Sequence, residues 1–334
     1  MPDNELRQDR VSGEWTVIAP ARSKRPRKVP LLKPREALAT RDADCPFCHG
    51  NEAELLRIIA EYPSDKPPGW SVRAILNKYA AFTPDASPPA SSGTQIAHPA
   101  FGYQEVIVET PDHGAGLWAL ADDQIAAVIR AYRDRFRALA ERDGVNSVIL
   151  FRNYGPGSGA SLPHAHSQLA ATALRAPRLK ALEARAREYH DCHHSCIVCD
   201  DLTQERTASS RIVDENEGFV THTPYAAHYP FELWITPRGH QARFDEIDDK
   251  ETGLFGLALR GALRRLRQLH GDFSYNFAID SAPVDAIGAP HLHWRLHLVP
   301  RLADWAGFEL GTGVFVNPSS PEENAAALRE AAID

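Results

Sequence analysis

The feature that most constrains this chain is a pair of Cys-x-x-Cys motifs, one in each half of the sequence. The four cysteines are Cys45, Cys48, Cys196 and Cys199. A fifth, Cys192, stands alone. Residues 1–10 hold no apolar run resembling a secretory signal, so we expect a cytoplasmic protein whose cysteines do not form structural disulfides. Closely spaced cysteine pairs in such a protein indicate metal or redox sites.

Zinc is the preferred interpretation of both motifs. A thioredoxin-type redox pair lies where a strand leads into a helix, and we expect neither motif at such a junction. His49 and Gly50 follow the first motif, as in a zinc knuckle. Two thiolates supply only half of the tetrahedral shell of zinc, so each motif needs two more ligands. Free structural thiols are the alternative.

The predicted secondary structure has the same order in both halves. Each half contains a cysteine pair, a strand that ends near a histidine, a long helix, a second strand and a histidine-bearing strand. Apolar side chains recur at intervals of three and four residues over 122–142 and 248–270, which predicts the two helices. The other predicted strands cover 15–18, 104–109, 147–151, 231–236 and 273–279. The repeated order indicates an internal duplication.

Histidine spacing supports the duplication and supplies the missing ligands. His113 and His164 are 51 positions apart, and His240 and His293 are 53 apart. We therefore assign one zinc ion to each half. The first set of predicted ligands is Cys45, Cys48, His113 and His164, and the second is Cys196, Cys199, His240 and His293. His291 is an alternative to His293, and the identity of the second metal is open.

Composition and charge limit the classes of protein to which the chain can belong. The chain has 334 residues, 43% of them hydrophobic and 24% charged, which is typical of a folded globular protein. We expect an α+β fold in which two histidine-triad-like halves, residues 1–175 and 176–334, each form an antiparallel sheet with a packed helix. The longest apolar runs are too short to span a membrane. A net charge of −7 argues against non-specific nucleic-acid binding.

The chemical centre is predicted between residues 155 and 168. A glycine-rich stretch leads to His164, His166 and Gln168. Side chains two residues apart on a strand share one face, so we expect all three to point the same way. Glycines let backbone amides approach a phosphate closely, and a neutral imidazole can attack an α-phosphorus to form a nucleotidyl-histidine. The pattern indicates transfer of a nucleotidyl group.

At this point the chain resembles the galactose-1-phosphate uridylyltransferase family, the transferase branch of the histidine-triad superfamily. The segments that carry the resemblance are Cys45-Pro46-Phe47-Cys48, Pro111-Asp112-His113, Asn153, residues 159–168 and Phe308-Glu309-Leu310-Gly311-Thr312-Gly313. The resemblance covers nearly the whole length. It implies a ping-pong transferase that takes its nucleotidyl group from a nucleoside diphosphate hexose, with a role in galactose metabolism. We also expect a homodimer.

The resemblance also implies roles for single residues. His166 corresponds to the nucleophile, and Gln168 corresponds to a donor to the phosphoryl oxygens. Six positions match nucleotide-binding or phosphate-binding residues of the family: Arg22, Arg25, Asn77, Asn153, Gly159 and Ser161. Arg295 aligns with His166 in the second half, which implies that this half has lost catalysis.

Two departures bear on the substrate. Gly313 occupies the place where sugar-uridylyl members of the family carry a hexose-binding glutamate, and the second metal site here contains cysteines. Both features resemble the branch that includes ADP-glucose phosphorylase. Uridylyl transfer to a hexose 1-phosphate is the first expectation, and adenylyl transfer to phosphate is the second. A hydrolase of the same superfamily and a non-catalytic zinc-dependent nucleotide-binding module also stay open as interpretations.

Overall fold

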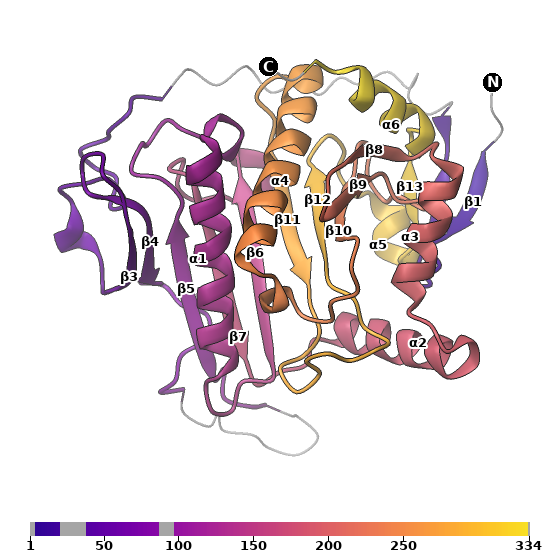
Figure 1. Cartoon of the computed structure of the whole chain (residues 1–334), viewed down its shortest axis with the longest axis horizontal. Helices are drawn as coiled ribbons and strands as arrows, with labels where there is room; N and C mark the ends of the chain where they lie inside the picture. Colours follow the sequence, from indigo (N-terminus) through magenta and orange to yellow (C-terminus); the bar gives the residue numbers. More distant parts are fainter. Residues whose placement is uncertain (1–3, 21–37, 87–96, 333–334) are drawn as a thin grey trace.

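A computed structural model of the chain describes residues 4–20, 38–86 and 97–332. Arg22 and Arg25 lie outside the described residues. The centre of the molecule is a ten-stranded sheet in which every neighbouring pair of strands is antiparallel (Figure 1). Its strands are β3 (Ile58–Pro63), β4 (Trp70–Leu76), β5 (Gly102–Val108), β6 (Ser147–Tyr154), β7 (His166–Thr172), β8 (Ile212–Glu215), β9 (Phe219–His222), β10 (Leu233–Pro237), β11 (Tyr275–Asp280) and β12 (Arg295–Pro300).

The two halves share this sheet, so the expectation of two separate sheets was wrong. Their junction is the antiparallel pair β6 and β11, where Phe151 to Tyr154 face Ala278 to Tyr275 in register. Backbone groups of an edge strand need partners. Here the backbone groups of β6, at the edge of the first half, pair with those of β11, at the edge of the second.

The strand order repeats about this junction. From the junction outward, the first half reads β6, β7, β5, β4, β3 and the second reads β11, β12, β10, β9, β8. In both halves the long helix connects the third strand from the junction to the strand at the junction: α1 (Asp122–Ala140) in the first and α4 (Asp249–His270) in the second. The repeat expected from the histidine spacing is therefore present in the topology.

Helices α1 and α4 lie side by side across one face of the sheet (Figure 1). Their apolar stripes enter one hydrophobic core that spans both halves, and Tyr132, Phe136, Phe255 and Leu263 are all at most 1% exposed. The helices approach closely at Gly256, where an added Cβ would lie 3.2 Å from Ile125. A larger residue there would push the helices apart.

In the part of the chain that the structure describes, the remaining elements are a small sheet, four shorter helices and several 3-10 turns. A small sheet joins both ends of the described chain, because β13 (Phe315–Asn317) pairs in parallel with β2 (Trp15–Ile18), which pairs with β1 (Glu5–Gln8). The other helices are α2 (Pro177–His193), α3 (Ile197–Ala208), α5 (Gly307–Thr312) and α6 (Pro321–Glu330). Short 3-10 turns cover Glu52–Glu54, Leu117–Ala119, Pro156–Ser158 and Phe244–Glu246. Among the described residues, no helix has both the length and the hydropathy to cross a bilayer.

Two local expectations need correction. His164 and His293 each lie two residues before a strand, because β7 begins at His166 and β12 at Arg295. The shared-face argument therefore holds for His166 and Gln168 only. The second cysteine motif is no knuckle, because Cys196 caps α3 and Cys199 lies in its first turn.

Candidate active site and two Cys/His clusters

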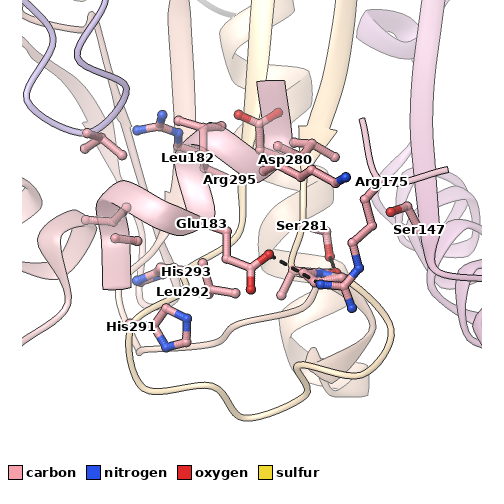
Figure 2. A pocket seen from close by; sticks show the side chains of 17 residues that line it. Ser147, Arg175, Leu182, Glu183, Asp280, Ser281, His291, Leu292, His293 and Arg295 are labelled. Atoms are coloured by element: carbon pink, nitrogen blue, oxygen red, sulfur yellow. Dashed lines mark hydrogen bonds and ion pairs between the residues drawn. The ribbon is translucent and has the colours of Figure 1, made fainter. Parts of the chain in front are cut away.

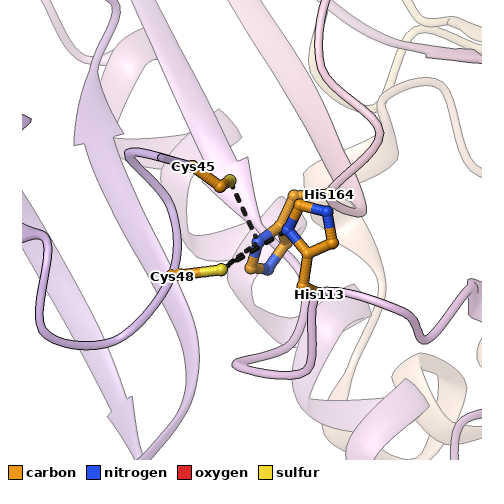
Figure 3. A group of neighbouring side chains, drawn as sticks. All are labelled: Cys45, Cys48, His113 and His164. Atoms are coloured by element: carbon orange, nitrogen blue, oxygen red, sulfur yellow. Dashed lines mark hydrogen bonds between the residues drawn. The ribbon is translucent and has the colours of Figure 1, made fainter. Parts of the chain in front are cut away.

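The first Cys/His cluster gathers four buried side chains from three segments of the first half (Figure 3). Cys45 and Cys48 lie on a tight turn, His113 follows β5 and His164 precedes β7. The Cys48 sulfur lies 3.4 Å from Nδ1 of His113, and both sulfurs lie 3.6 Å from Nδ1 of His164. Asn51 holds the turn by donating to the carbonyls of residues 42, 43 and 45.

These distances fit a tetrahedral zinc ion. Zn–S bonds of about 2.3 Å and Zn–N bonds of about 2.0–2.1 Å, at tetrahedral angles, place sulfur and nitrogen about 3.5 Å apart. The imidazole of His164 is also prepared for a metal, because its Nε2 donates to the carbonyl of Thr110 over 2.8 Å. That hydrogen bond leaves the Nδ1 lone pair directed at the sulfurs. Burial raises the pKa of the Cys45 thiol to about 11, so a thiolate here needs a cation beside it.

The second cluster repeats this arrangement in the second half. The sulfur of Cys199 lies 3.4 Å from Nδ1 of His240 and 3.3 Å from Nδ1 of His293, and Cys196 completes the group. Nε2 of His240 lies 3.2 Å from the carbonyl of Ala289, which again frees Nδ1. The structure thus brings together His293 and not His291. This cluster is more exposed than the first.

The orientation of the His166 ring is set by His164, which is a member of the first cluster. Nδ1 of His166 donates to the backbone carbonyl of His164 over 2.8 Å, so the lone pair of the neutral ring lies on Nε2. The ring is 7% exposed and packs against the edge of Phe47, at 5.3 Å between ring centroids. Burial is the main reason that the pKa of His166 is lowered, with the charge of Arg152 contributing. Nε2 is therefore an unprotonated, oriented nitrogen near neutral pH.

Gln168 lies on the same face of β7, two residues further along. Its Oε1 accepts hydrogen bonds from Nδ2 of Asn77, over 3.1 Å, and from Nε2 of Gln104, over 2.9 Å. Backbone amides fix both donors, because Tyr79 donates to Oδ1 of Asn77 and Ala81 donates to Oε1 of Gln104.

With its oxygen held this way, Gln168 presents its NH₂ group as a donor that no acceptor among the described residues occupies. No motif pointed to Gln104. It lies on β5 opposite Ala170, two residues along β7 from Gln168, and only this diagonal contact reveals its role.

The glycine-rich stretch forms a short 3-10 turn beside this strand, followed by Gly159 in a left-handed conformation with φ of +84°. Gly159 and Ser161 are both exposed. Asn153 lies at the end of β6, where its Oδ1 accepts from Nδ2 of Asn276 over 2.7 Å. Asn276 also donates to the carbonyl of Ser158 over 3.0 Å. A residue of the second half therefore steadies this loop of the first.

A buried ion pair lies beneath β7, on the face opposite His166. Arg152 and Glu109 are 1% and 0% exposed and contact each other directly. Glu109 also accepts from Ser167 over 2.6 Å and from the hydroxyl of Tyr132. Arg152 donates to the backbone carbonyl of His166 over 3.3 Å. This network, which sequence reasoning missed, holds the backbone of the strand at His166.

Known proteins resemble the chain over almost its whole length. The family model for the N-terminal domain of galactose-1-phosphate uridyl transferase matches residues 2–175, and the model for the C-terminal domain matches residues 183–309. An ADP-glucose phosphorylase from Arabidopsis thaliana is 32% identical, with 98% of this chain and 93% of that protein covered. A galactose-1-phosphate uridylyltransferase from Thermotoga maritima is 28% identical, with 99% of each covered.

A solved structure gives the same result. The crystal structure of an ADP-glucose phosphorylase from Arabidopsis thaliana with bound ADP-glucose has a TM-score of 0.85 and 30% sequence identity, and the match covers 100% of both chains. The resemblance inferred from the motifs is thereby confirmed. The chain belongs to the galactose-1-phosphate uridylyltransferase family and is a nucleotidyltransferase.

Proposed function

We propose that the protein moves a nucleoside monophosphate from a nucleoside diphosphate hexose to a second phosphate-bearing substrate through a covalent bond to His166. The observation that carries this proposal is the oriented Nε2 of His166 on the same strand face as the Gln168 NH₂ group, for which the described residues supply no acceptor. One group is a nucleophile, and the other is a donor to a charged oxygen. Their pairing suits phosphoryl chemistry.

In the first half-reaction, the Nε2 lone pair attacks the α-phosphorus and a new N–P bond forms. The bond from the α-phosphorus to the bridging oxygen breaks, and hexose 1-phosphate leaves with that electron pair. Negative charge grows on the non-bridging oxygens of the α-phosphate, where the Gln168 amide can donate. In the second half-reaction, an oxygen of the acceptor phosphate attacks the phosphorus and the N–P bond breaks.

We propose that each Cys/His cluster holds a zinc ion. The distances within the first cluster support zinc, and the cysteine and histidine donors match its ligand preference. Bound there, zinc would neutralise the buried thiolates and fix the backbone at His164. His164 supplies the carbonyl that orients His166. This metal site would therefore support catalysis by positioning the His166 ring, without contacting the substrate.

We further propose that residues 1–175 form the catalytic half and residues 176–334 a non-catalytic repeat of a histidine-triad-like unit. Arg295 supports this division, because it begins β12 as His166 begins β7. A guanidinium stays protonated in proteins and cannot act as a nucleophile.

Donor and acceptor are assigned as follows. Uridylyl transfer between hexose phosphates agrees with the uridylyltransferase relatives. Adenylyl transfer to phosphate is favoured by the ADP-glucose phosphorylase relative and by Gly313, whose φ of +70° disfavours a side chain and so a hexose-binding carboxylate. The other proposed substrate contacts are Arg22, Arg25, Asn77, Asn153, Gly159 and Ser161. We propose a cytoplasmic homodimer whose partners are the nucleotide sugar and a sugar phosphate or phosphate.

A labelling experiment tests the proposal. The protein is incubated with UDP-glucose or ADP-glucose carrying ³²P in the α-phosphate, and acid-labile label on the protein is counted. Label is expected from one of the two donors and should be lost in His166→Gly, whereas His98→Gly, at an exposed position, keeps it. Label that persists in His166→Gly would refute the assignment.

A chase then identifies the acceptor. The labelled protein is mixed with galactose 1-phosphate, orthophosphate or buffer alone. Rapid loss of label with galactose 1-phosphate indicates the uridylyltransferase reaction, and loss with orthophosphate indicates a phosphorylase. Equally rapid loss in buffer indicates the hydrolase. Binding of nucleotide sugar without label would indicate a non-catalytic module.

A further inference from the structure

The second half contains a cavity at the position that the internal repeat makes equivalent to the catalytic site. Arg295 corresponds to His166, His293 to His164, and Val198 to Phe47 within the Cys-x-x-Cys motifs. The pairing registers extend the correspondence, because Phe151 faces Gln168 as Ala278 faces His297. Two residues on from these partners, Asp280 takes the place of Asn153. Val198, Asp280, His293 and Arg295 all line one cavity (Figure 2).

This cavity lies beside the second Cys/His cluster and is covered by α2. Its volume is about 70 Å³. By the same measure a single water molecule needs about 10–15 Å³, so the space suits a group of several atoms. Figure 2 shows Glu183 of α2 facing Arg175, and their ion pair spans 3.7 Å. Arg175 also pairs with Asp285.

Arg295 carries the inference. The residue is 3% exposed, and its guanidinium lies over the ring of Trp234 at 3.7 Å from the centroid. Within the described parts of the chain, no carboxylate pairs with this guanidinium and no hydrogen bond to it is found. The nearby Asp280 is already engaged by His297 at 3.1 Å and by Arg178 at 2.8 Å. Burying an unpaired charge is costly, so a buried guanidinium normally has an anionic partner.

Two further groups around the cavity are available to a ligand. Nε2 of His291 is buried and has no hydrogen-bond partner among the described residues, and His291 is 7% exposed. Lys180 also lines the cavity from the exposed surface of α2, and its ammonium has no ion pair with any described carboxylate.

The two acids of the lining, Glu183 and Asp280, are engaged by other cations. The half-buried Asp201 acts on Arg295 through its charge without forming an ion pair. Arg295 and Lys180 are therefore left without a contacting anion among the described residues. An anion would satisfy both.

We propose that this cavity is a second, non-catalytic binding site for a small phosphate anion, held by Arg295 with help from Lys180 and His291. Guanidinium groups bind phosphate oxygens through charge-assisted, often bidentate hydrogen bonds. The site resembles the catalytic one in position and differs in having an arginine where the nucleophile stands. It binds phosphate and performs no transfer. The ligand is orthophosphate or the phosphate group of a hexose 1-phosphate, and both take part in the chemistry of this family.

The test measures binding apart from turnover. Full-length His166→Gly protein, which cannot form the covalent intermediate, is saturated with nucleotide sugar to fill the catalytic site. Equilibrium dialysis with ³²P-orthophosphate should then show about one phosphate bound per chain. Arg295→Gln in the same background should weaken this binding at least tenfold, and Lys180→Met should weaken it severalfold. Arg187→Gln is the matched control, because this exposed arginine of α2 does not line the cavity.

Competition identifies the source of the phosphate group. If glucose 1-phosphate displaces the label as well as unlabelled orthophosphate does, the site accepts a phosphate monoester. If it does not, the site is specific for orthophosphate. Metal content and circular dichroism check that Arg295→Gln is folded. If Arg295→Gln does not fold, the test relies on Lys180→Met, whose substitution lies on the surface of α2. The proposal is overturned if no phosphate binds once the catalytic site is filled, or if both variants bind it as tightly as their parent.

Discussion

His166 donates a hydrogen bond from its Nδ1 to the backbone carbonyl of His164, 2.8 Å away. The proposed nucleophile is therefore oriented by the main chain of a residue whose own ring belongs to the first Cys/His cluster. If the backbone of His164 shifts, the hydrogen bond to Nδ1 shifts with it, and the orientation of the His166 ring changes. The second cluster has no such link, because Arg295 replaces the nucleophile there.

Removal of the two metals should therefore have unequal effects. We expect Cys48→Ser to lose one zinc per chain and to lower kcat by about 10²-fold, the usual cost of a 1 Å misplacement of a reacting group. Cys199→Ser should lose one zinc, lower the Tm and leave kcat within about threefold, because its cluster does not orient the proposed nucleophile. Metal analysis, calorimetry and steady-state kinetics check this. Equal losses of kcat in the two variants would contradict it.

The amide network predicts a positioning role for Gln104. Gln104→Leu removes one of the two donors that hold Oε1 of Gln168, so the Gln168 amide can rotate away from the substrate. We expect kcat to fall about tenfold with KM little changed, against about 10²–10³-fold for Gln168→Ala. In a double-mutant cycle, Gln104→Leu should cost nothing further once Gln168 is Ala. Additive losses would show that Gln104 acts by another route.

The ion pair under β7 predicts a large stability effect. Glu109→Gln or Arg152→Met alone leaves an unpaired charge in a fully buried site, which should lower the free energy of unfolding by about 3–5 kcal/mol. The double variant should be less destabilised than the sum of the two, because neither charge remains. Urea unfolding of the four proteins measures this coupling. Strict additivity would mean that the pair does not act as a unit.

The buried His222 predicts a pH-dependent stability. Burial, followed by the charge of Arg295, lowers its pKa to about 3, and Arg211 acts in the same direction while Asp9 opposes it. The folded state therefore leaves this ring neutral between about pH 3 and 6.5, whereas the unfolded chain protonates it. Stability must fall as pH falls through that window, by up to about 1.4 kcal/mol per pH unit.

Phenylalanine at position 222 removes this titration while keeping a ring against Trp234. Free energies of unfolding are measured for both proteins at pH 7.5, where His222 is neutral in the folded and the unfolded state, and at pH 5.5. The natural protein should lose about 1.4 kcal/mol more than His222→Phe over this interval. Parallel pH curves for the two proteins would contradict the assignment.

Much of this site could be predicted from residues whose chemistry is distinctive. The eight cysteines and histidines proposed as ligands were predicted from motif and spacing, and each set of four is found within one cluster. The long helices follow from the periodicity of side chains such as Tyr132 and Leu263. In both cases a local pattern reflects a local physical requirement.

Other features depend on contacts that no local pattern records. Gln104 is an ordinary strand residue until β5 lies beside β7, and Arg152 becomes a buried ion only because Glu109 lies opposite. His164 was expected on a strand, but a ring that reaches the cysteines lies before the strand begins. The single sheet was missed for a similar reason, because residue spacing does not reveal which edges pair.

The junction of β6 and β11 has a consequence for the origin of the molecule. Each of these strands is the innermost member of its repeat, and they meet in antiparallel register. A single ancestral unit could have paired the same strand with its own copy, because an antiparallel contact between identical strands is compatible with twofold symmetry. Duplication and fusion of the gene would then have converted a dimer of two such units into a single chain. The second repeat would then have exchanged its histidine for Arg295, while the first kept His166.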